Sequence, residues 1–145
     1  MASEILVRSV NIALLGYSSL VAIAMMTSFR KDMLSNRSQR LFFSKIAVAT
    51  VTNDMLERSG AVEDDLDDLA GLAGRCEGSI VNITIREKDD GSCRVSVRTT
   101  EEVSSSEICA VFGGGGHAMA SGCTINGDPD KVCEMILHVV NEVWK

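Results

Sequence analysis

Basic residues are scarce in this chain of 145 residues, and that scarcity excludes one broad class of function. There are 14 Lys and Arg against 20 Asp and Glu, which gives a net charge of −6. A broad electrostatic grip on long nucleic acid requires clustered Lys and Arg, so we do not expect one here. A small phosphate ligand is still allowed, because one arginine and a few backbone amides are enough to hold it.

Paired cysteines are also lacking. The chain has an odd number of cysteines at wide spacings, and no two of them form a C-x-x-C pair. We find no cleavable signal segment, so we expect reduced thiols in a cytoplasmic protein, several of them as plain core residues. The cysteines are Cys76, Cys93, Cys109, Cys123 and Cys133.

Residues that could bind a metal are few. The only histidines are His117 and His138, and the one dense acidic cluster, "EDDLDD" at 63–68, has no histidine nearby in sequence. A dinuclear site needs a richer donor set than this. We therefore interpret the cluster as the solvated face of a helix and expect no metal or other cofactor to be bound by this chain alone.

What is present indicates an α/β protein with a single domain, in which helices flank a mixed β-sheet. The stretch 79–87 alternates apolar and polar residues, and 93–100 returns after an Asp-Gly turn, so the two predict a hairpin. Asp128 followed by Pro129 predicts the start of a final helix. Further segments are predicted as strands at 41–52 and 123–125 and as helices at 53–60, 62–72 and 104–112, with Asn53 as the cap of the first of these helices.

The N-terminal part is different, because Ser9–Phe29 carries no charge. We predict one long apolar helix over 3–29 and a polar connector over 30–40, so that 1–40 resembles an interdomain linker and 41–145 forms the domain. A run of about 20 apolar residues can span a membrane, but the polar residues in this one disfavour insertion. Packing on this domain, or on a neighbour absent from this chain, is favoured.

Four consecutive glycines, 113–116, stand directly before His117. Glycines can bring backbone amides close to a ligand, and successive amides form a nest that binds anions. The next side chain, an imidazole, could donate to a phosphate oxygen. The alternative is a helix end followed by a flexible turn, although one glycine is enough to end a helix.

The strand "CRVSVRT" supplies a second element. Alternation places Arg94, Ser96 and Arg98 on one face, which could point toward the glycine run. Arg98 would then contact a phosphate through two hydrogen bonds. An ordinary solvated face is the alternative.

Together, the stretches "CRVSVRT" and "ICAVFGGGGHAMASGC" resemble the sequence of a known protein family. With "KIAVATVTNDMLERSGA" and "EGSIVNITIRE" before them, they resemble the C-terminal, substrate-binding domain of the DHH phosphoesterases. The likeness covers about 41–145. Within that superfamily the chain is most similar to the group of short-oligoribonucleotide exonucleases and 3′-phosphoadenosine-5′-phosphate phosphatases, and the exonuclease RecJ is more distant.

The resemblance implies a hydrolase of small nucleotides, short single-stranded oligonucleotides or nucleotide phosphates. In the family a separate N-terminal domain with an Asp-His-His motif binds two metal ions, for which manganese is the expected metal. That motif is lacking here, so we expect this chain alone to bind substrate weakly and to turn over nothing. The substrate-binding residues implied are Arg98, Gly113, Gly114, Gly115, Gly116 and His117, with Ser96 as a weaker candidate. Ser121 replaces a more usual alanine, and we expect little consequence from that.

A non-catalytic regulatory or assembly module is the rival hypothesis. In it the glycine run is purely structural, and the apolar segment Ser9–Phe29 joins two chains into a homodimer or binds a partner protein, since an exposed apolar helix should associate.

Overall fold

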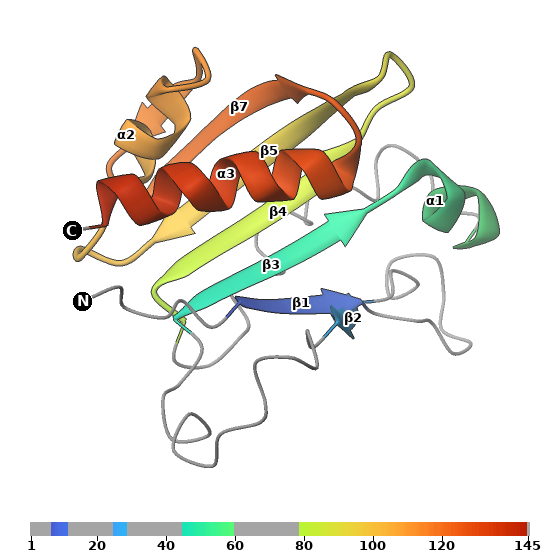
Figure 1. Ribbon diagram of the computed structural model, residues 1–145, viewed down its shortest axis with the longest axis horizontal. Helices are drawn as coiled ribbons and strands as arrows, with labels where there is room; N and C mark the ends of the chain where they lie inside the picture. Colours follow the sequence, from blue (N-terminus) through green and yellow to red (C-terminus); the bar gives the residue numbers. More distant parts are fainter. Residues whose placement is uncertain (1–6, 12–24, 29–44, 60–78, 145) are drawn as a thin grey trace.

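The computed structural model describes residues 7–11, 25–28, 45–59 and 79–144. They form one mixed sheet of seven strands in the order β2-β1-β3-β4-β5-β7-β6 (Figure 1). The strands are β1 (Val7–Asn11), β2 (Met25–Ser28), β3 (Ile46–Val51), β4 (Val81–Glu87), β5 (Ser92–Thr99), β6 (Gly115–His117) and β7 (Ala120–Asn126). The helices are α1 (Asn53–Ser59), α2 (Ser105–Ala110) and α3 (Pro129–Val143). The predicted class, α/β with a mixed sheet flanked by helices, is confirmed.

The centre of the sheet is the predicted hairpin of β4 and β5. The two strands pair antiparallel from Val81 with Thr99 to Glu87 with Cys93. In the turn Gly91 adopts a positive φ of 78°, a conformation that glycine reaches without steric cost. On its other edge β4 pairs with β3 in parallel, and β5 pairs with β7 antiparallel, which makes the sheet mixed.

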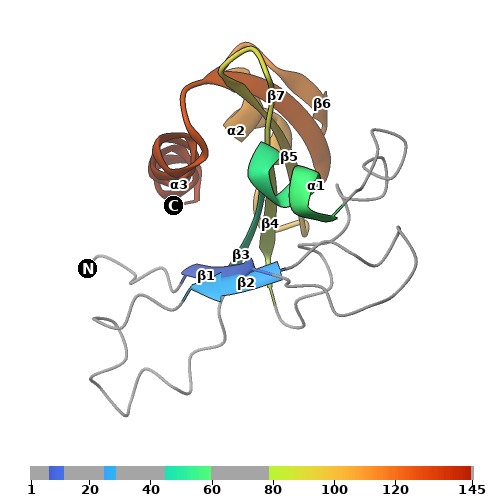
Figure 2. The same cartoon turned by 90° about the vertical axis from the view of Figure 1, so that its right-hand side faces the viewer.

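The hydrophobic core lies on one face of this sheet. The alternating aliphatic residues of β4 and β5 point to that face, and helices α2 and α3 cover it. Figure 2 shows α3 lying along one side of the sheet. The largest fully buried side chains of this layer are Ile46, Val48, Val81, Ile83, Ile85, Val95, Val97, Ile108, Val132, Ile136 and Val140. Each buried aliphatic side chain of this size contributes about 1.5–3 kcal/mol relative to an exposed one.

Helix α3 begins as its sequence predicts. The Asp128 side chain accepts a hydrogen bond from the amide of Lys131 at 3.0 Å, and Pro129 occupies the first turn. One cap prediction is wrong, because α1 is capped by Thr52 rather than by Asn53. The Thr52 hydroxyl accepts from the amide of Met55 at 3.2 Å, whereas the amide of Asn53 donates to the Glu87 carboxylate at 2.9 Å.

The N-terminal segment departs from the prediction of a helix over 3–29. Where this range is described it contains strands, β1 and β2, and β1 pairs in parallel with β3. That pairing gives hydrogen-bond partners to the backbone N–H and C=O groups along one edge of β3. A separate helix would leave those backbone groups without strand partners. Residues 12–24, the predicted connector 30–40 and the helix predicted over 62–72, with its acidic cluster, lie outside the described residues. No helix within the described ranges is long and apolar enough to cross a membrane.

Candidate substrate-binding site

The pairing of β5, β7 and β6 brings Arg98 and His117 into one row across the sheet. Arg98 lies opposite Ala120 on β7, and Ala120 lies opposite His117 on β6. Directly opposed residues of antiparallel strands point to the same face, and adjacent strands are about 4.8 Å apart. The two residues therefore share a face with their backbones about 10 Å apart. This face is opposite the one to which Val95 and Val97 point, so it is the face not covered by α3.

The Arg98 side chain is half-buried and held against the sheet. Its Nη1 donates to the carbonyl of Val97 at 3.1 Å and to that of Ser121 at 3.4 Å. A guanidinium has five N–H donors in a fixed fork, so these bonds leave capacity for an anion. Ser96, also half-buried, lies in the next row, opposite Thr84 and Gly122.

The first two glycines of the run complete the end of α2. The amide of Gly113 donates to the carbonyl of Ala110 at 3.0 Å, and the amide of Gly114 donates to that of Cys109 at 2.9 Å. Gly113 has a φ of 73°, which is common for the residue that ends a helix. Two of the four amides are therefore used by the helix. Gly115 and Gly116 are successive residues of β6, and successive amides of a strand point to opposite edges, so only one of the two can face an anion beside the outer edge.

Close backbone approaches explain two members of the run. A Cβ on Gly114 would lie 2.5 Å from Cys123 Cβ, and one on Gly116 would lie 2.7 Å from Ser121 Cα. Both distances are far inside van der Waals contact, so β6 lies against β7 only because these positions lack side chains. A Cβ on Gly115, by contrast, would meet nothing within 4 Å. Gly115 is exposed and faces open space.

The turn that carries His117 is fixed by two side chains outside it. The fully buried Ser105 donates through its hydroxyl to the carbonyls of His117 and Ala118, both at 3.0 Å. Thr99 donates to the carbonyl of Ala118 at 3.2 Å. The His117 side chain itself is exposed. Sequence reasoning missed Ser105, because a serine in the first turn of a helix is typical of capping and gives no sign of a distant partner.

Ser121 belongs to the same network. Its buried hydroxyl donates to the carbonyl of Ser105 at 2.5 Å, which ties β7 to the first turn of α2. The hydroxyl of Ser121 therefore makes a hydrogen bond that an alanine could not make. The expectation from sequence, that serine in place of alanine has little consequence, did not include this bond.

Two thiols lie beneath the glycine run, Cys109 from α2 and Cys123 from β7. Both are buried, and both are free, as are Cys93 and Cys133. The hydrogen bond with Cys123 lowers the pKa of the Cys109 thiol to about 7, with smaller lowering contributions from Ser121 and the charge of Arg98. The same bond, with burial, raises the pKa of Cys123. The Arg98 charge thus acts on groups directly beneath the glycine run.

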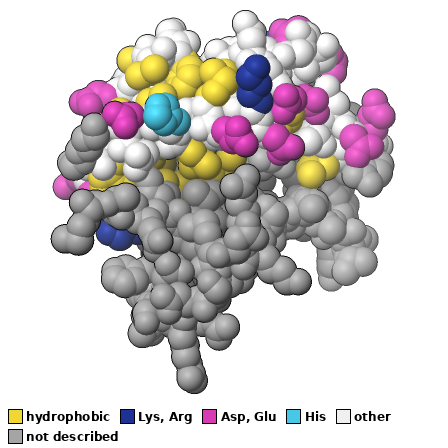
Figure 3. All heavy atoms as spheres, viewed as in Figure 1, with side chains coloured by type: hydrophobic (Ala, Val, Ile, Leu, Met, Phe, Trp, Pro, Cys, Tyr) yellow, Lys and Arg dark blue, Asp and Glu magenta, His cyan; other side chains and the backbone are white. Residues whose placement is uncertain are grey.

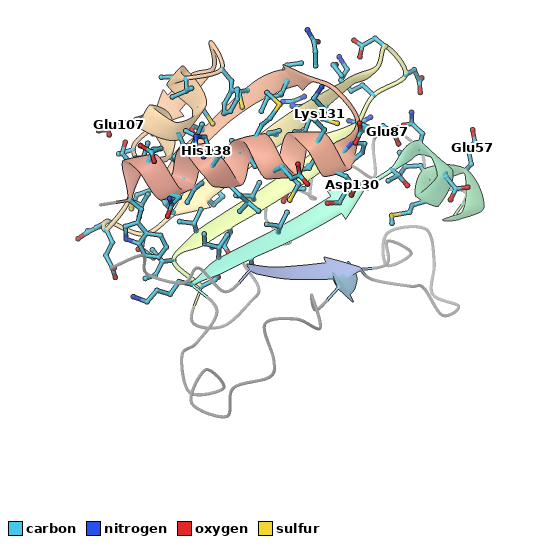
Figure 4. The ribbon with its side chains drawn as sticks, viewed as in Figure 1. Glu57, Glu87, Glu107, Asp130, Lys131 and His138 are labelled. Carbon is cyan, nitrogen blue, oxygen red and sulfur yellow. The ribbon has the colours of Figure 1, made fainter. Side chains whose placement is uncertain are left out.

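The donor set around Arg98 does not fit a manganese ion. Manganese prefers carboxylate, carbonyl and water oxygens, whereas the row offers a guanidinium and an imidazole. Within residues 45–59 and 79–144, the structure gathers no three His, Cys, Asp or Glu side chains that could hold a metal ion. The other histidine, His138, is exposed on α3 (Figure 4), on the covered side of the sheet. The arrangement suits an anion, and we assign no metal-dependent step to these residues.

The fold and this row define an α/β domain with a guanidinium and an imidazole on the face of its sheet opposite α3. Residues 44–145 match the DHHA1 domain family, and the chain belongs to that family, the C-terminal domain of the DHH superfamily. The chain is 41% identical over 93 residues to the bifunctional oligoribonuclease and PAP phosphatase NrnA of Thermus thermophilus. It is 50% identical over 48 residues to the oligoribonuclease NrnB of Bacillus subtilis.

These matches cover 63% and 32% of this chain, but only 28% and 11% of the two relatives. The chain thus matches less than a third of either relative. Among solved structures, an exopolyphosphatase-related protein from Bacteroides fragilis superposes with a TM-score of 0.61 at 17% identity. That superposition covers 68% of this chain and 29% of that protein, and it shows a shared fold.

Proposed function

We propose that this chain is the substrate-binding part of a metal-dependent DHH phosphoesterase acting on short oligonucleotides or nucleotide phosphates. Arg98 and His117 bind a phosphate group on the face of the sheet opposite α3, and the glycine backbone of 113–116 lies at the edge of this site. The metal ions, with manganese expected, and the groups that activate water come from a catalytic DHH domain outside this chain. The names of the two relatives, an oligoribonuclease and PAP phosphatase and a second oligoribonuclease, support this choice of substrate.

One observation carries the proposal most directly. Residues 19 positions apart in sequence, Arg98 and His117, fall into a single row because β5, β7 and β6 are in register. Two cationic or hydrogen-bonding side chains about 10 Å apart, with a glycine backbone at one end, suit an anionic ester rather than an apolar ligand. We place the activity in the cytoplasm, as expected for a sequence whose cysteines are few, odd in number and widely spaced.

The first test is the Arg98→Gln variant of the full chain, titrated with adenosine monophosphate and with a phosphorylated dinucleotide. A charge-assisted fork to phosphate is lost, so we expect binding to weaken about tenfold or more. Amide shifts of Gly115 and Gly116 in NMR spectra report the binding site directly. In the wild-type chain they should move on titration with either nucleotide.

Lys131→Gln is the matched control, because it removes the same charge from exposed α3 on the opposite side of the sheet (Figure 4). It should leave binding within about twofold. The proposal fails if the wild-type amides do not shift at millimolar nucleotide, or if both variants bind as the wild type does.

The non-catalytic module remains a second candidate, because three of the four glycines have a structural reason to be there. Gly113 requires a positive φ, and Gly114 and Gly116 have no room for a side chain. A wild-type chain that forms concentration-dependent dimers and binds no nucleotide would favour the module.

A further inference from the structure

Two buried thiols that belong to different elements meet beneath the glycine run. Cys109 lies in α2 and Cys123 lies in β7. Cys109 is fully buried, whereas Cys123 keeps 7% of its surface exposed. The two side chains share a hydrogen bond. Thiols that bond to each other have Cβ vectors that converge, and a disulfide has the same requirement.

The backbone around the pair holds the two residues together independently of their sulfur atoms. The carbonyl of Cys109 accepts from the amide of Gly114 at 2.9 Å, and a Cβ on Gly114 would lie 2.5 Å from Cys123 Cβ. Gly114 is therefore bonded to one cysteine and packed against the other. The bond from the Ser121 hydroxyl to the Ser105 carbonyl ties the same helix to the same strand. The fold thus presents the two thiols to each other as a fixed pair.

The surroundings of the pair favour loss of a proton from one thiol. The hydrogen bond with Cys123 lowers the pKa of the Cys109 thiol to about 7 against the opposite effect of burial, and Ser121 and the charge of Arg98 add smaller lowering contributions. A thiolate, not a thiol, is the form of cysteine that reacts with peroxides. A thiolate with a second thiol beside it is also the arrangement found in cysteines that are oxidised reversibly.

Cys93 shows the contrasting environment. Its thiol donates to the carbonyl of Gly127 at 3.4 Å, and in the strand register it lies opposite Ile125 rather than Cys123. Burial raises the pKa of Cys93, and the charges of Glu87 and Asp128 raise it further. Asp and Glu side chains gather along the α3 side of the molecule (Figure 3), where their charge opposes the ionisation of nearby thiols. Cys93 is therefore a buried thiol that should resist oxidation.

We propose that Cys109 and Cys123 form a reversible oxidation site, at which hydrogen peroxide converts the two thiols into an intramolecular disulfide. The Cys109 thiolate attacks a peroxide oxygen, so that the O–O bond breaks and a sulfenic acid and hydroxide form. The sulfur of Cys123 then attacks the sulfenic sulfur, the S–S bond forms, and the hydroxyl group leaves with the Cys123 proton as water. Overall, two thiols give up two electrons and two protons, and the peroxide is reduced to two water molecules. This inference is independent of the function proposed above.

The fold can accommodate the new bond and admit the oxidant. The sulfur atoms must move from hydrogen-bond separation to about 2.05 Å. Helix α2 has only six residues, so a small shift of the helix can supply that movement. Local opening of so short a helix also admits a molecule of the size of peroxide. Once formed, the disulfide anchors the end of α2, where the glycine run begins, to β7 (Figure 1).

The test treats the full, folded chain with millimolar hydrogen peroxide at about pH 8, where the thiolate is abundant. Remaining thiols are alkylated, and peptides from a digest without reductant are mapped by mass spectrometry. We expect a crosslinked peptide that joins Cys109 to Cys123 and disappears on treatment with dithiothreitol. The urea midpoint of the oxidised chain should rise, because a crosslink restricts the unfolded chain, and should return to its first value after reduction.

Cys93→Ala and Cys133→Ala are the matched controls, and both should keep the crosslink. Cys123→Ala should abolish it and let Cys109 proceed to the sulfinic acid, because no second thiol is left to capture the sulfenic acid. The mapping of the wild-type chain decides the matter even if that variant does not fold. A folded wild-type chain without the crosslink, a crosslink to Cys76 in its place, a crosslink that forms only in urea, or a urea midpoint that falls on oxidation would each overturn the proposal.

Discussion

Each glycine of the run 113–116 meets a different physical constraint. Gly113 supplies the positive φ that ends α2, and Gly114 and Gly116 let β6 approach β7. Gly115 alone has open space around the position of its absent side chain. From sequence, the four look equivalent, and only the pairing of β6 with β7 distinguishes them.

Substitution of two neighbouring glycines should therefore have opposite consequences. Gly114→Ala places a methyl group against Cys123 and the carbonyl of Gly122, so the free energy of unfolding should fall by about 1–3 kcal/mol or more. Gly115→Ala should change it by less than about 1 kcal/mol, because nothing is displaced. Urea unfolding of both variants measures the difference. Equal loss in the two would show that β6 is not held against β7.

At the scale of elements, α2 and β7 are joined beneath the glycine run by polar and sulfur contacts. Ser121 donates to the carbonyl of Ser105, and the thiols of Cys109 and Cys123 share a hydrogen bond. The helix has only six residues, too few to be stable alone, so these contacts hold it in place.

The thiol pair gives the stability of this junction a dependence on pH. The Cys109 pKa is lowered from 9.0 to about 7, so its ionised form adds stability that grows from about pH 7 to about pH 9 and is lost as the pH falls through 7. The raised pKa of Cys123 acts in the opposite sense, because above about pH 9 only the unfolded chain ionises that thiol. We expect the contribution of the pair to be greatest near pH 9.

Urea midpoints measured from about pH 6 to pH 10 test this expectation. Cys109→Ala should remove the rise between about pH 7 and pH 9 that the wild type shows. Cys133→Ala is the control, since that thiol is half-buried on α3 and outside the pair. An unchanged pH profile in Cys109→Ala would show that the pair does not titrate as described.

The elements that the sequence predicts well are those with local causes. The alternation of 79–87 and the Asp-Gly turn define the hairpin, and Asp128 with Pro129 defines the start of α3. The contacts between segments that are far apart in sequence were not predictable. The partner of Ser105 is twelve residues away across a turn, and β1 became a strand only by pairing with β3, more than thirty residues on. Arg98 and His117 were singled out as residues, but their common row depends on register, which no local pattern encodes.

On the scale of the whole molecule, the proposed function assigns substrate binding to this chain and catalysis to another domain. In the part of the chain that the structure describes, the site offers a guanidinium and an imidazole but no cluster of oxygen ligands that could hold the catalytic metals. We expect no release of mononucleotide from a short oligonucleotide when the full chain is incubated with manganese. Chromatography of the products measures this, and the nucleotide-induced NMR shifts confirm in the same sample that the chain is competent to bind. Robust hydrolysis by the chain alone would contradict the division of labour.

The bonds from Ser105 and Thr99 to the turn at His117 have a consequence for affinity. A run of glycines has the highest backbone entropy of any sequence when unfolded, and a ligand that had to order it would bind weakly. Here neighbouring side chains restrict that freedom as the chain folds. Under the proposed function, a nucleotide would meet a preorganised backbone and an Arg98 side chain already held by two hydrogen bonds, so its association should carry mainly the smaller entropic penalty of fixing the exposed His117 side chain.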